Sequence, residues 1–213
     1  MELNNLKCAL VLAPHTDDAE FGCGGTISKL LDMGVEVNCA VFSACQQSVR
    51  PEFPSDILIT EFHAASDALG IGTDKRFLYE YDVRTFNFNR QHILDDLIKL
   101  RNTVKPDLVF LPSLNDIHQD HATICDEGIR AFKFSSILCY EMPWNNFHFS
   151  TTCFIQLSES DLQGKIDAIS VYKSQAHRPY ANGDFIKSLA VTRGVQSGHK
   201  YAEAFEVVRW IIK

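Results

Sequence analysis

Short apolar runs alternate along the chain with stretches in which apolar residues recur at helical spacing, a pattern typical of crossover units around a parallel sheet. Runs that are apolar or β-branched throughout predict buried strands over residues 6–13, 35–43, 108–111 and 137–140. Helical spacing predicts helices over residues 20–33, 57–69, 91–105, 121–132 and 161–172. Weaker patterns predict strands over residues 77–82 and 202–212. The order of these segments predicts an α/β fold with a mostly parallel sheet.

Residues with special backbone preferences set the predicted ends of several segments. Pro14 is predicted to end the first strand. Gly34 and Gly70 are predicted to end the first two helices, where a left-handed residue is favoured. Ser158 or Ser160 is predicted to cap the helix that begins at residue 161.

Length and composition favour one domain over residues 1–213. A chain of 213 residues that is 46% hydrophobic can bury one sizeable core, and it contains no repeat or linker. Seven cysteines without a CxxC pair are typical of reduced thiols. The N-terminal segment lacks the pattern of a signal peptide, and no apolar run approaches the ~20 residues of a membrane span. We therefore expect a cytoplasmic protein.

Charge narrows the class of partner. The net charge is −7, and there is no basic run. This balance argues against nucleic acid or an anionic membrane as a partner. A small soluble substrate is the expectation that remains.

Two segments rich in metal-ligating residues follow predicted strands. The first contains His15, Asp17 and Asp18, together with Glu20. The second is His118-Gln119-Asp120-His121, after the strand over residues 108–111. Ligands of open parallel sheets bind at the carboxyl ends of the strands, so both segments are expected at one edge.

Together the two segments can fill every role of a hydrolytic zinc site. Such a site uses three nitrogen or oxygen ligands and leaves one position open. His15, Asp18 and His121 are the predicted ligands, and Asp17 is the predicted general base. As an imidazolium whose ring is oriented by Asp120, His118 is expected to stabilise an oxyanion or protonate a leaving amine.

Each segment taken alone also has an ordinary structural interpretation. A histidine in a loop is often a surface residue, and two aspartates before a helix often serve as N-terminal caps. The combination of both segments at one sheet edge favours the metal site. The nearby glycines, in FGCGGT, do not have the spacing of a dinucleotide site, and we interpret them as allowing the helix to pack closely on the sheet.

These motifs resemble those of the LmbE/PIG-L family of zinc-dependent de-N-acetylases, whose signatures are (A/P)HPDD-x-E, followed by a glycine-rich helix start, and HxDH. Here they read PHTDDAEFGCGGTI over residues 14–27 and HQDH over residues 118–121. The similarity extends over nearly the whole chain, with PDLVFLPS leading into the second motif. One departure is Thr16, where the family more often has proline. This change loosens the loop backbone without removing a ligand.

The resemblance implies a Rossmann-like three-layer sandwich, one zinc ion per site and hydrolysis of an N-acetyl group. The expected substrate is N-acetylglucosamine joined to another group, or a related amino sugar. By position, His15, Asp18 and His121 match the metal ligands, and Asp17 matches the general base. His118 and Asp120 match the electrostatic pair. Iron or cobalt could occupy two histidines and one aspartate in place of zinc.

Residues that contact the substrate are harder to predict. Some relatives place an arginine from the loop after the second strand near the sugar, and Arg50 occupies that loop. Arg84, Arg178, Tyr140 and Trp144 are further candidates, because arginines and aromatic faces recur in sugar pockets. Each of them can equally serve a structural role.

Two other functions stay open at this point. The same metal site could hydrolyse another small amide, an ester or a thiol conjugate in natural-product synthesis. Alternatively, the protein could be a catalytically inactive sugar-binding relative, although a binding protein has no use for a free carboxylate such as Asp17 beside an open metal position. Assembly into a homo-oligomer is also compatible with the sequence.

Overall fold

The computed structural model describes residues 6–212, which form one seven-stranded sheet between two layers of helices. The strand order is β3-β2-β1-β4-β5-β7-β6. The first five of these pair in parallel, whereas β7 is antiparallel to both β5 and β6. The strands are β1 (Cys8–His15), β2 (Glu36–Ser43), β3 (Arg76–Leu78), β4 (Leu108–Pro112), β5 (Ser136–Tyr140), β6 (Cys153–Leu157) and β7 (Tyr201–Arg209). The predicted α/β class with a mostly parallel sheet is confirmed.

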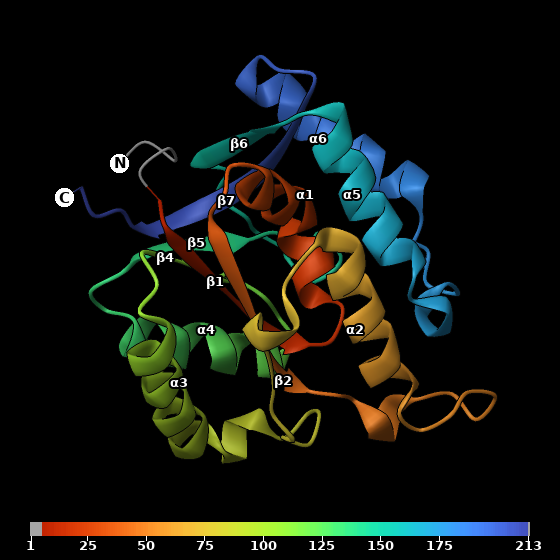
Figure 1. Ribbon diagram of the computed structural model, residues 1–213, viewed down its shortest axis with the longest axis vertical. Coiled ribbons are helices and arrows are strands. Elements are labelled where there is room, and N and C mark those ends of the chain that lie inside the picture. Colours follow the sequence, from red (N-terminus) through yellow and green to blue (C-terminus); the bar gives the residue numbers. More distant parts are fainter. Residues whose placement is uncertain (1–5, 213) are drawn as a thin grey trace.

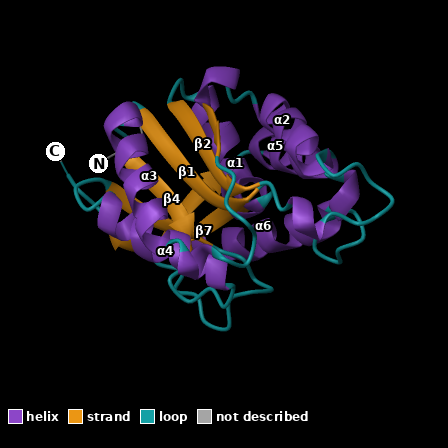
Figure 2. Ribbon diagram, turned by 90° about the horizontal axis from the view of Figure 1, so that it is seen from below, coloured by secondary structure: helices purple, strands orange, loops and turns teal. Residues whose placement is uncertain are grey.

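Six α-helices cover the two faces of the sheet. They are α1 (Asp18–Asp32), α2 (Ile57–Leu69), α3 (Arg90–Val104), α4 (Gln119–Ala131), α5 (Glu159–Ser170) and α6 (Gly183–Ser197). Figures 1 and 2 show α3 and α4 on one face and the other four helices on the opposite face. The result is the three-layer arrangement that the family resemblance implied.

The alternation of side chains along β1 explains why there are two cores. Ala9, Val11 and Ala13 belong to the core beneath α1, α2, α5 and α6. Leu10 and Leu12 belong to the core beneath α3 and α4. Successive side chains of a strand point to opposite faces, so an apolar run without polar interruptions is required where both faces are covered.

Most predicted segment ends agree with the structure, but Pro14 does not end the first strand. Gly34 and Gly70 have φ angles of 78° and 87°, in the left-handed region, and Ser158 caps α5 by accepting a hydrogen bond from the Asp161 backbone. The strand β1 continues through Pro14 to His15. Its ladder with β4 has already ended at Val11, so proline interrupts no pairing on that side.

The structure contains a strand and a helix that the sequence pattern did not predict, β6 and α6. Apolar residues of α6 lie around the helix rather than on one face, since Ile186 is buried while Val195 is 74% exposed. Its ends are nevertheless well marked: Asn182 accepts a hydrogen bond from the Phe185 N–H, and Gly198 ends the helix with a φ of 76°. Hydrophobic periodicity alone therefore misses this helix.

The helix α1, which carries the first predicted metal motif, is broken at Cys23, where φ and ψ are −147° and 24°. The glycines beside the break allow close packing, as predicted from the sequence. A Cβ atom added to Gly22 would overlap the ring of Tyr140, and one added to Gly25 would lie 2.5 Å from Leu157. Side chains at these two positions would push α1 away from the sheet.

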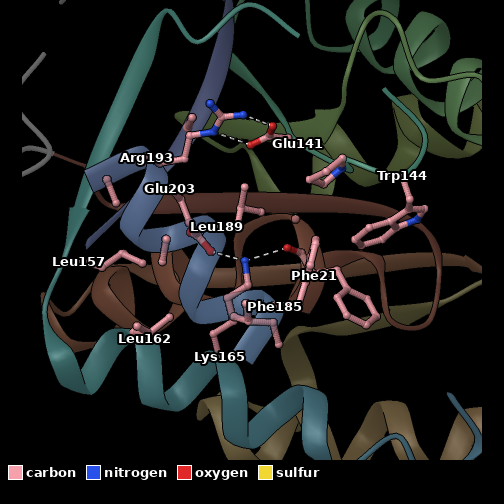
Figure 3. Close-up of a pocket in the computed structure, with 16 residues that line it drawn as sticks. Phe21, Glu141, Trp144, Leu157, Leu162, Lys165, Phe185, Leu189, Arg193 and Glu203 are labelled. Atoms are coloured by element: carbon pink, nitrogen blue, oxygen red, sulfur yellow. Dashed lines mark hydrogen bonds and ion pairs between the residues drawn. The ribbon is translucent and has the colours of Figure 1, made fainter. Parts of the chain in front are cut away.

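A buried ion pair holds the two sides of this break (Figure 3). Lys165, from α5, donates to the Phe21 carbonyl at 2.7 Å and to Glu203 Oε1 at 2.6 Å. Glu203, from β7, accepts from the backbone N–H groups of Gly25 and Thr26 at 3.1 and 2.7 Å. Both charged residues are at most 6% exposed. They satisfy backbone groups on either side of the break and so fix the first turn of α1.

Candidate metal centre

The two predicted metal motifs meet at the carboxyl edge of the sheet. His15 is the last residue of β1, Asp18 is the first residue of α1, and His121 lies in the first turn of α4, which follows β4. The strands β1 and β4 are parallel neighbours, and β2 lies on the other side of β1. After β1 the chain adds β2 and β3 on one side, and it then crosses to the other side of β1 to add β4 and β5. Open α/β sheets form their ligand sites at such a reversal of strand order.

Three donor atoms converge at this edge. His15 Nδ1, Asp18 Oδ2 and His121 Nε2 form a triangle in which each side is 3.2 Å. Ligands at 2.0–2.1 Å from a tetrahedral zinc ion are separated by about 3.3 Å. The triangle therefore has the dimensions of one face of a tetrahedral metal site.

A second possible set replaces the aspartate with His118. The donor atoms of His15, His118 and His121 all lie within 4.8 Å of one another. This set is more open than the triangle that includes Asp18. In addition, Nδ1 of His118 already accepts a hydrogen bond from the Asp120 backbone N–H at 3.2 Å. The geometry favours the predicted ligands His15, Asp18 and His121.

Carboxylates behind the two histidines orient their rings. Asp120 Oδ2 lies 3.2 Å from His15 Nε2, and Asp116 Oδ2 lies 2.8 Å from His121 Nδ1. In the neutral form of each ring, the carboxylate accepts the N–H, so the other nitrogen has a lone pair that can bind a cation at the centre. The two acids thereby select the tautomers that bind a cation.

This geometry corrects the predicted role of Asp120. The sequence suggested that its carboxylate orients His118, whereas the carboxylate contacts His15 and accepts from the backbone N–H groups of Arg84 and Phe86. Only the backbone N–H of Asp120 reaches His118. A side chain at the start of a helix points back past the preceding turn, and here that direction leads to β1.

Charges within the centre shift the pKa values of its members. Burial would raise the pKa of Asp18, but the neighbouring charges of His121 and His15 lower it well below its ordinary value. Burial also opposes protonation of His121, yet Asp18 and Asp116 raise its pKa to about 10. These two residues therefore form an ionic pair when no cation is bound.

The pKa values of Asp17 and His118 shift in the directions opposite to those of Asp18 and His121: the pKa of the acid is raised and that of the imidazole is lowered. Burial, together with the charge of Asp18, raises the pKa of Asp17 to about 6. Burial and the positive charges of His121 and His15 lower the pKa of His118 to about 4. An acid with a raised pKa and a neutral imidazole that line one cleft are the combination found where protons are transferred.

The centre opens into a cleft of about 640 Å³. Asp17 and His118 line this cleft, as do three of the predicted substrate contacts, Arg84, Trp144 and Arg178. The backbone carbonyl of Thr16, at the departure from the family motif, accepts a hydrogen bond of 2.5 Å from the buried Tyr172. The loop is thus anchored without the family's proline.

Two other predicted substrate contacts lie outside the cleft. Tyr140 is fully buried, and its hydroxyl donates to the Leu12 carbonyl at 3.0 Å, so the prediction that it contacts a sugar is wrong. Arg50 does not line the cleft, and its half-exposed side chain pairs with Glu52 at 2.6 Å. Glu20 is buried as well, and burial raises its pKa to about 8.

An aromatic wall completes the cleft. The rings of Trp144 and Tyr180 are stacked with centroids 3.7 Å apart, and Phe21 meets both rings edge-on at 5.4 and 5.5 Å. Tyr180 was not predicted as a site residue. It lies in the segment between α5 and α6, which follows no strand, so the rule that sites form at strand ends could not find it.

The segment that carries Tyr180 is anchored to α2. Glu61 is buried and accepts hydrogen bonds from Ser174 N at 3.0 Å and Ser174 Oγ at 2.5 Å. Gln175, next in the chain, also lines the cleft. A buried acid on one helix thus fixes a wall of the cleft that the sheet itself does not supply.

The site defines an α/β enzyme with a candidate metal centre of two imidazoles and one carboxylate, and comparison with known proteins identifies its family. A sequence model of the PIG-L family, described as GlcNAc-PI de-N-acetylase, matches residues 10–132. The chain belongs to this family. Membership confirms the predicted class of enzyme, a deacetylase that hydrolyses amide bonds.

Individual relatives agree with this assignment. The chain is 22% identical to the diacetylchitobiose deacetylase of Thermococcus kodakarensis, over 96% of this chain and 84% of the relative. The structure of the N,N'-diacetylchitobiose deacetylase of Pyrococcus horikoshii, complexed with an inhibitor, superposes with a TM-score of 0.81 at 24% identity, covering 97% of this chain and 85% of that one.

The same fold also supports a different reaction. The 4-carboxy-2-hydroxymuconate hydratase GalB of Pseudomonas putida superposes with a TM-score of 0.78 at 19% identity, covering 98% of each chain. Fold similarity at this level does not determine the reaction. Among the described residues, no helix has the length and apolar character needed to cross a membrane.

Proposed function

We propose that the protein is a zinc-dependent hydrolase that removes the N-acetyl group from an N-acetylglucosamine-containing or related amino-sugar substrate. The observation that carries this proposal is the 3.2 Å triangle of His15, Asp18 and His121, with the further acid Asp17 on the adjoining cleft. When bound, zinc supplies Lewis-acid chemistry that polarises a carbonyl and makes water a stronger acid.

Asp17 is the proposed general base. Its carboxylate lines the cleft and makes no ion pair among residues 6–212, so it is free to accept a proton from the attacking water. With a pKa near 6, it is ionised at neutral pH yet basic enough to take that proton. It then returns the proton to the leaving nitrogen. The C–N bond of the amide breaks, a C–O bond forms, and acetate and a free amine result.

His118 is the proposed donor to the oxyanion, but as a neutral ring rather than the imidazolium that the sequence suggested. Its lowered pKa keeps it neutral, and its Nδ1 accepts the Asp120 N–H. The ring proton of a neutral histidine must then reside on Nε2. A fixed N–H donor stabilises the negative charge that develops on the carbonyl oxygen.

The test is release of primary amine from a panel of N-acetylated amino sugars by the zinc-loaded protein. We expect release by the native chain, and a loss of about 10²–10⁴-fold in kcat for Asp17→Asn with zinc still bound. Full activity of the zinc-loaded variant would show that Asp17 is not the base. Bound zinc without amine release from the amino sugars, and turnover only of another small amide, an ester or a thiol conjugate, would favour the alternative hydrolase. No turnover of any kind would favour a sugar-binding protein.

The cytoplasmic location and a homo-oligomeric state remain predictions from the sequence.

A further inference from the structure

Glu206 is a buried acid of β7 that the proposed chemistry does not use. It lies opposite Cys139 of β5 and is 4% exposed. Glu203, on the same strand, pairs with Lys165 at 2.6 Å, whereas Glu206 forms no ion pair within residues 6–212. Burying a carboxylate is costly unless an opposite charge or hydrogen bonds compensate for it. The compensation for Glu206 comes from hydrogen-bond donors alone.

These donors belong to the two loops that follow β4 and β5. Oε2 of Glu206 accepts from Ser113 Oγ at 2.8 Å and from the Leu114 N–H at 3.1 Å. Oε1 accepts from the Ser150 N–H at 3.1 Å. Because β5 lies between β4 and β7 in the sheet, the side chain reaches past one strand to contact the first of these loops. One carboxylate therefore connects both loops.

The loop after β4 carries Asp116, the acid behind His121. Oγ of Ser113, which donates to Glu206, accepts from the Asn115 N–H at 3.1 Å. The carbonyl of Ser113 accepts from the Asp116 N–H at 3.3 Å. The carboxylate of Asp116 then lies 2.8 Å from Nδ1 of His121. A continuous series of hydrogen bonds thus joins Glu206 to a proposed metal ligand.

Apolar packing does little to fix this loop. The side chains on either side of Asp116, those of Leu114 and Ile117, are 52% and 57% exposed, and Phe147 in the second loop is 89% exposed. Burial of apolar surface, the usual source of order in a loop, is therefore small here. The Ile117 N–H donates to the Asn145 carbonyl at 3.2 Å, which ties the two loops together. Hydrogen bonds determine where Asp116 lies.

We infer that Glu206 is a positioning residue of the metal centre, which holds the loop after β4 so that Asp116 can orient His121 toward the cation. This inference rests on the proposed zinc site and adds a residue that supports it from outside. Glu206 does not line the cleft. Its effect on zinc passes through Asp116.

Two variants interrupt the same hydrogen bond from opposite ends. Glu206→Gln leaves one side-chain oxygen, which cannot accept from both loops. Ser113→Ala removes the hydroxyl that joins Glu206 to the loop. We expect each variant to bind zinc about three- to tenfold more weakly than the native chain, less than the ~10–100-fold loss when a direct partner of a ligand is removed. A competitive chelator titration at one pH measures this affinity.

Glu61→Gln is the matched control for general destabilisation. Glu61 is also 4% exposed, and it accepts from the N–H and the hydroxyl of Ser174, in a segment without a proposed metal ligand. Thermal unfolding should show a similar loss of stability for Glu61→Gln and Glu206→Gln, but only the second should lose zinc affinity. An equal loss of zinc affinity in both variants would overturn the inference.

A double-mutant cycle with Asp116→Ala tests the route of the effect. In this background no carboxylate remains to be positioned, so Glu206→Gln and Ser113→Ala should lower zinc affinity no further. Their effect on thermal unfolding should persist, because the hydrogen bond of Glu206 to Ser113 is lost in either background. Losses of zinc affinity that are equal in the two backgrounds, or native affinity in both single variants, would overturn the inference.

The amine-release assay on the native zinc-loaded protein reports separately on the proposed function. Zinc binding without amine release, together with the expected cycle, would reject the deacetylase and keep the role of Glu206. Amine release by the native chain, together with unchanged zinc affinity of Glu206→Gln and Ser113→Ala, would keep the deacetylase and remove that role.

Discussion

The buried ion pair behind the break in α1 gives a quantitative prediction of stability. Glu203→Gln removes the countercharge of Lys165, which is only 5% exposed and would keep the Phe21 carbonyl as its remaining partner. It also replaces one of the two oxygens that accept from Gly25 and Thr26. Leaving one member of a buried ion pair alone costs about 3–5 kcal/mol. We expect the free energy of unfolding to fall by about this amount.

This loss is large compared with the ~5–15 kcal/mol that stabilises a typical domain. Urea unfolding, followed by circular dichroism, measures it. Glu159→Gln is the matched control, because Glu159 and Lys200 form an ion pair of 2.9 Å near the same two elements, α5 and β7, but are 74% and 67% exposed. Screening by water leaves such a pair nearly without effect on stability.

The double variant Lys165→Met with Glu203→Gln tests whether the uncompensated charge of Lys165 causes the loss of stability. It leaves no uncompensated charge, so it should be more stable than Glu203→Gln alone. If Glu203→Gln is no less stable than Glu159→Gln, then the ion pair does not hold the break and the reasoning is refuted.

Three further predictions concern the centre and its surroundings. Asp116→Asn leaves a single oxygen, which cannot accept from both the His118 N–H and His121 Nδ1, and removes the negative charge behind the ring, so zinc affinity should fall about 10–100-fold; unchanged affinity in a competitive chelator titration would contradict the proposed ring orientation. Because the pKa of His121 is raised to about 10, this ring is protonated in the metal-free protein at neutral pH and must lose its proton to bind zinc. The measured zinc affinity should therefore rise with pH below about 10, by about tenfold per pH unit for each proton released. Calorimetry in buffers of different ionisation enthalpy counts the protons released on zinc binding, and a count of zero would contradict this prediction. Tyr140→Phe should lower the free energy of unfolding by about 1 kcal/mol through loss of its hydrogen bond to Leu12 and should leave KM unchanged; a raised KM would restore Tyr140 to the substrate site.

The sequence predicted the part of the site that lies at strand ends. His15 and His121 follow strands whose apolar runs are continuous, and neighbouring parallel strands bring their carboxyl ends together. Their convergence therefore follows from the alternation of segments alone. The same logic could not find Asp116, whose role depends on which way a loop side chain turns toward His121.

The walls of the cleft were predicted less well, for a physical reason. Tyr180 and Gln175 come from the segment between α5 and α6, and its position depends on the contact between Glu61 and Ser174, residues 113 positions apart. Tyr140 was misassigned because it ends a strand at the correct edge, but its ring fills the space left by Gly22. Local sequence does not show which face of the strand end a side chain will occupy.

The central claim is that His15, Asp18 and His121 hold one divalent cation. Anomalous diffraction at the zinc edge, from crystals of the zinc-loaded protein, tests it directly. The account predicts one strong peak at about 2.0–2.2 Å from His15 Nδ1, Asp18 Oδ2 and His121 Nε2, with Asp17 unligated. A peak bound by His118 in place of Asp18, or a fully loaded protein whose zinc lies elsewhere, would contradict it.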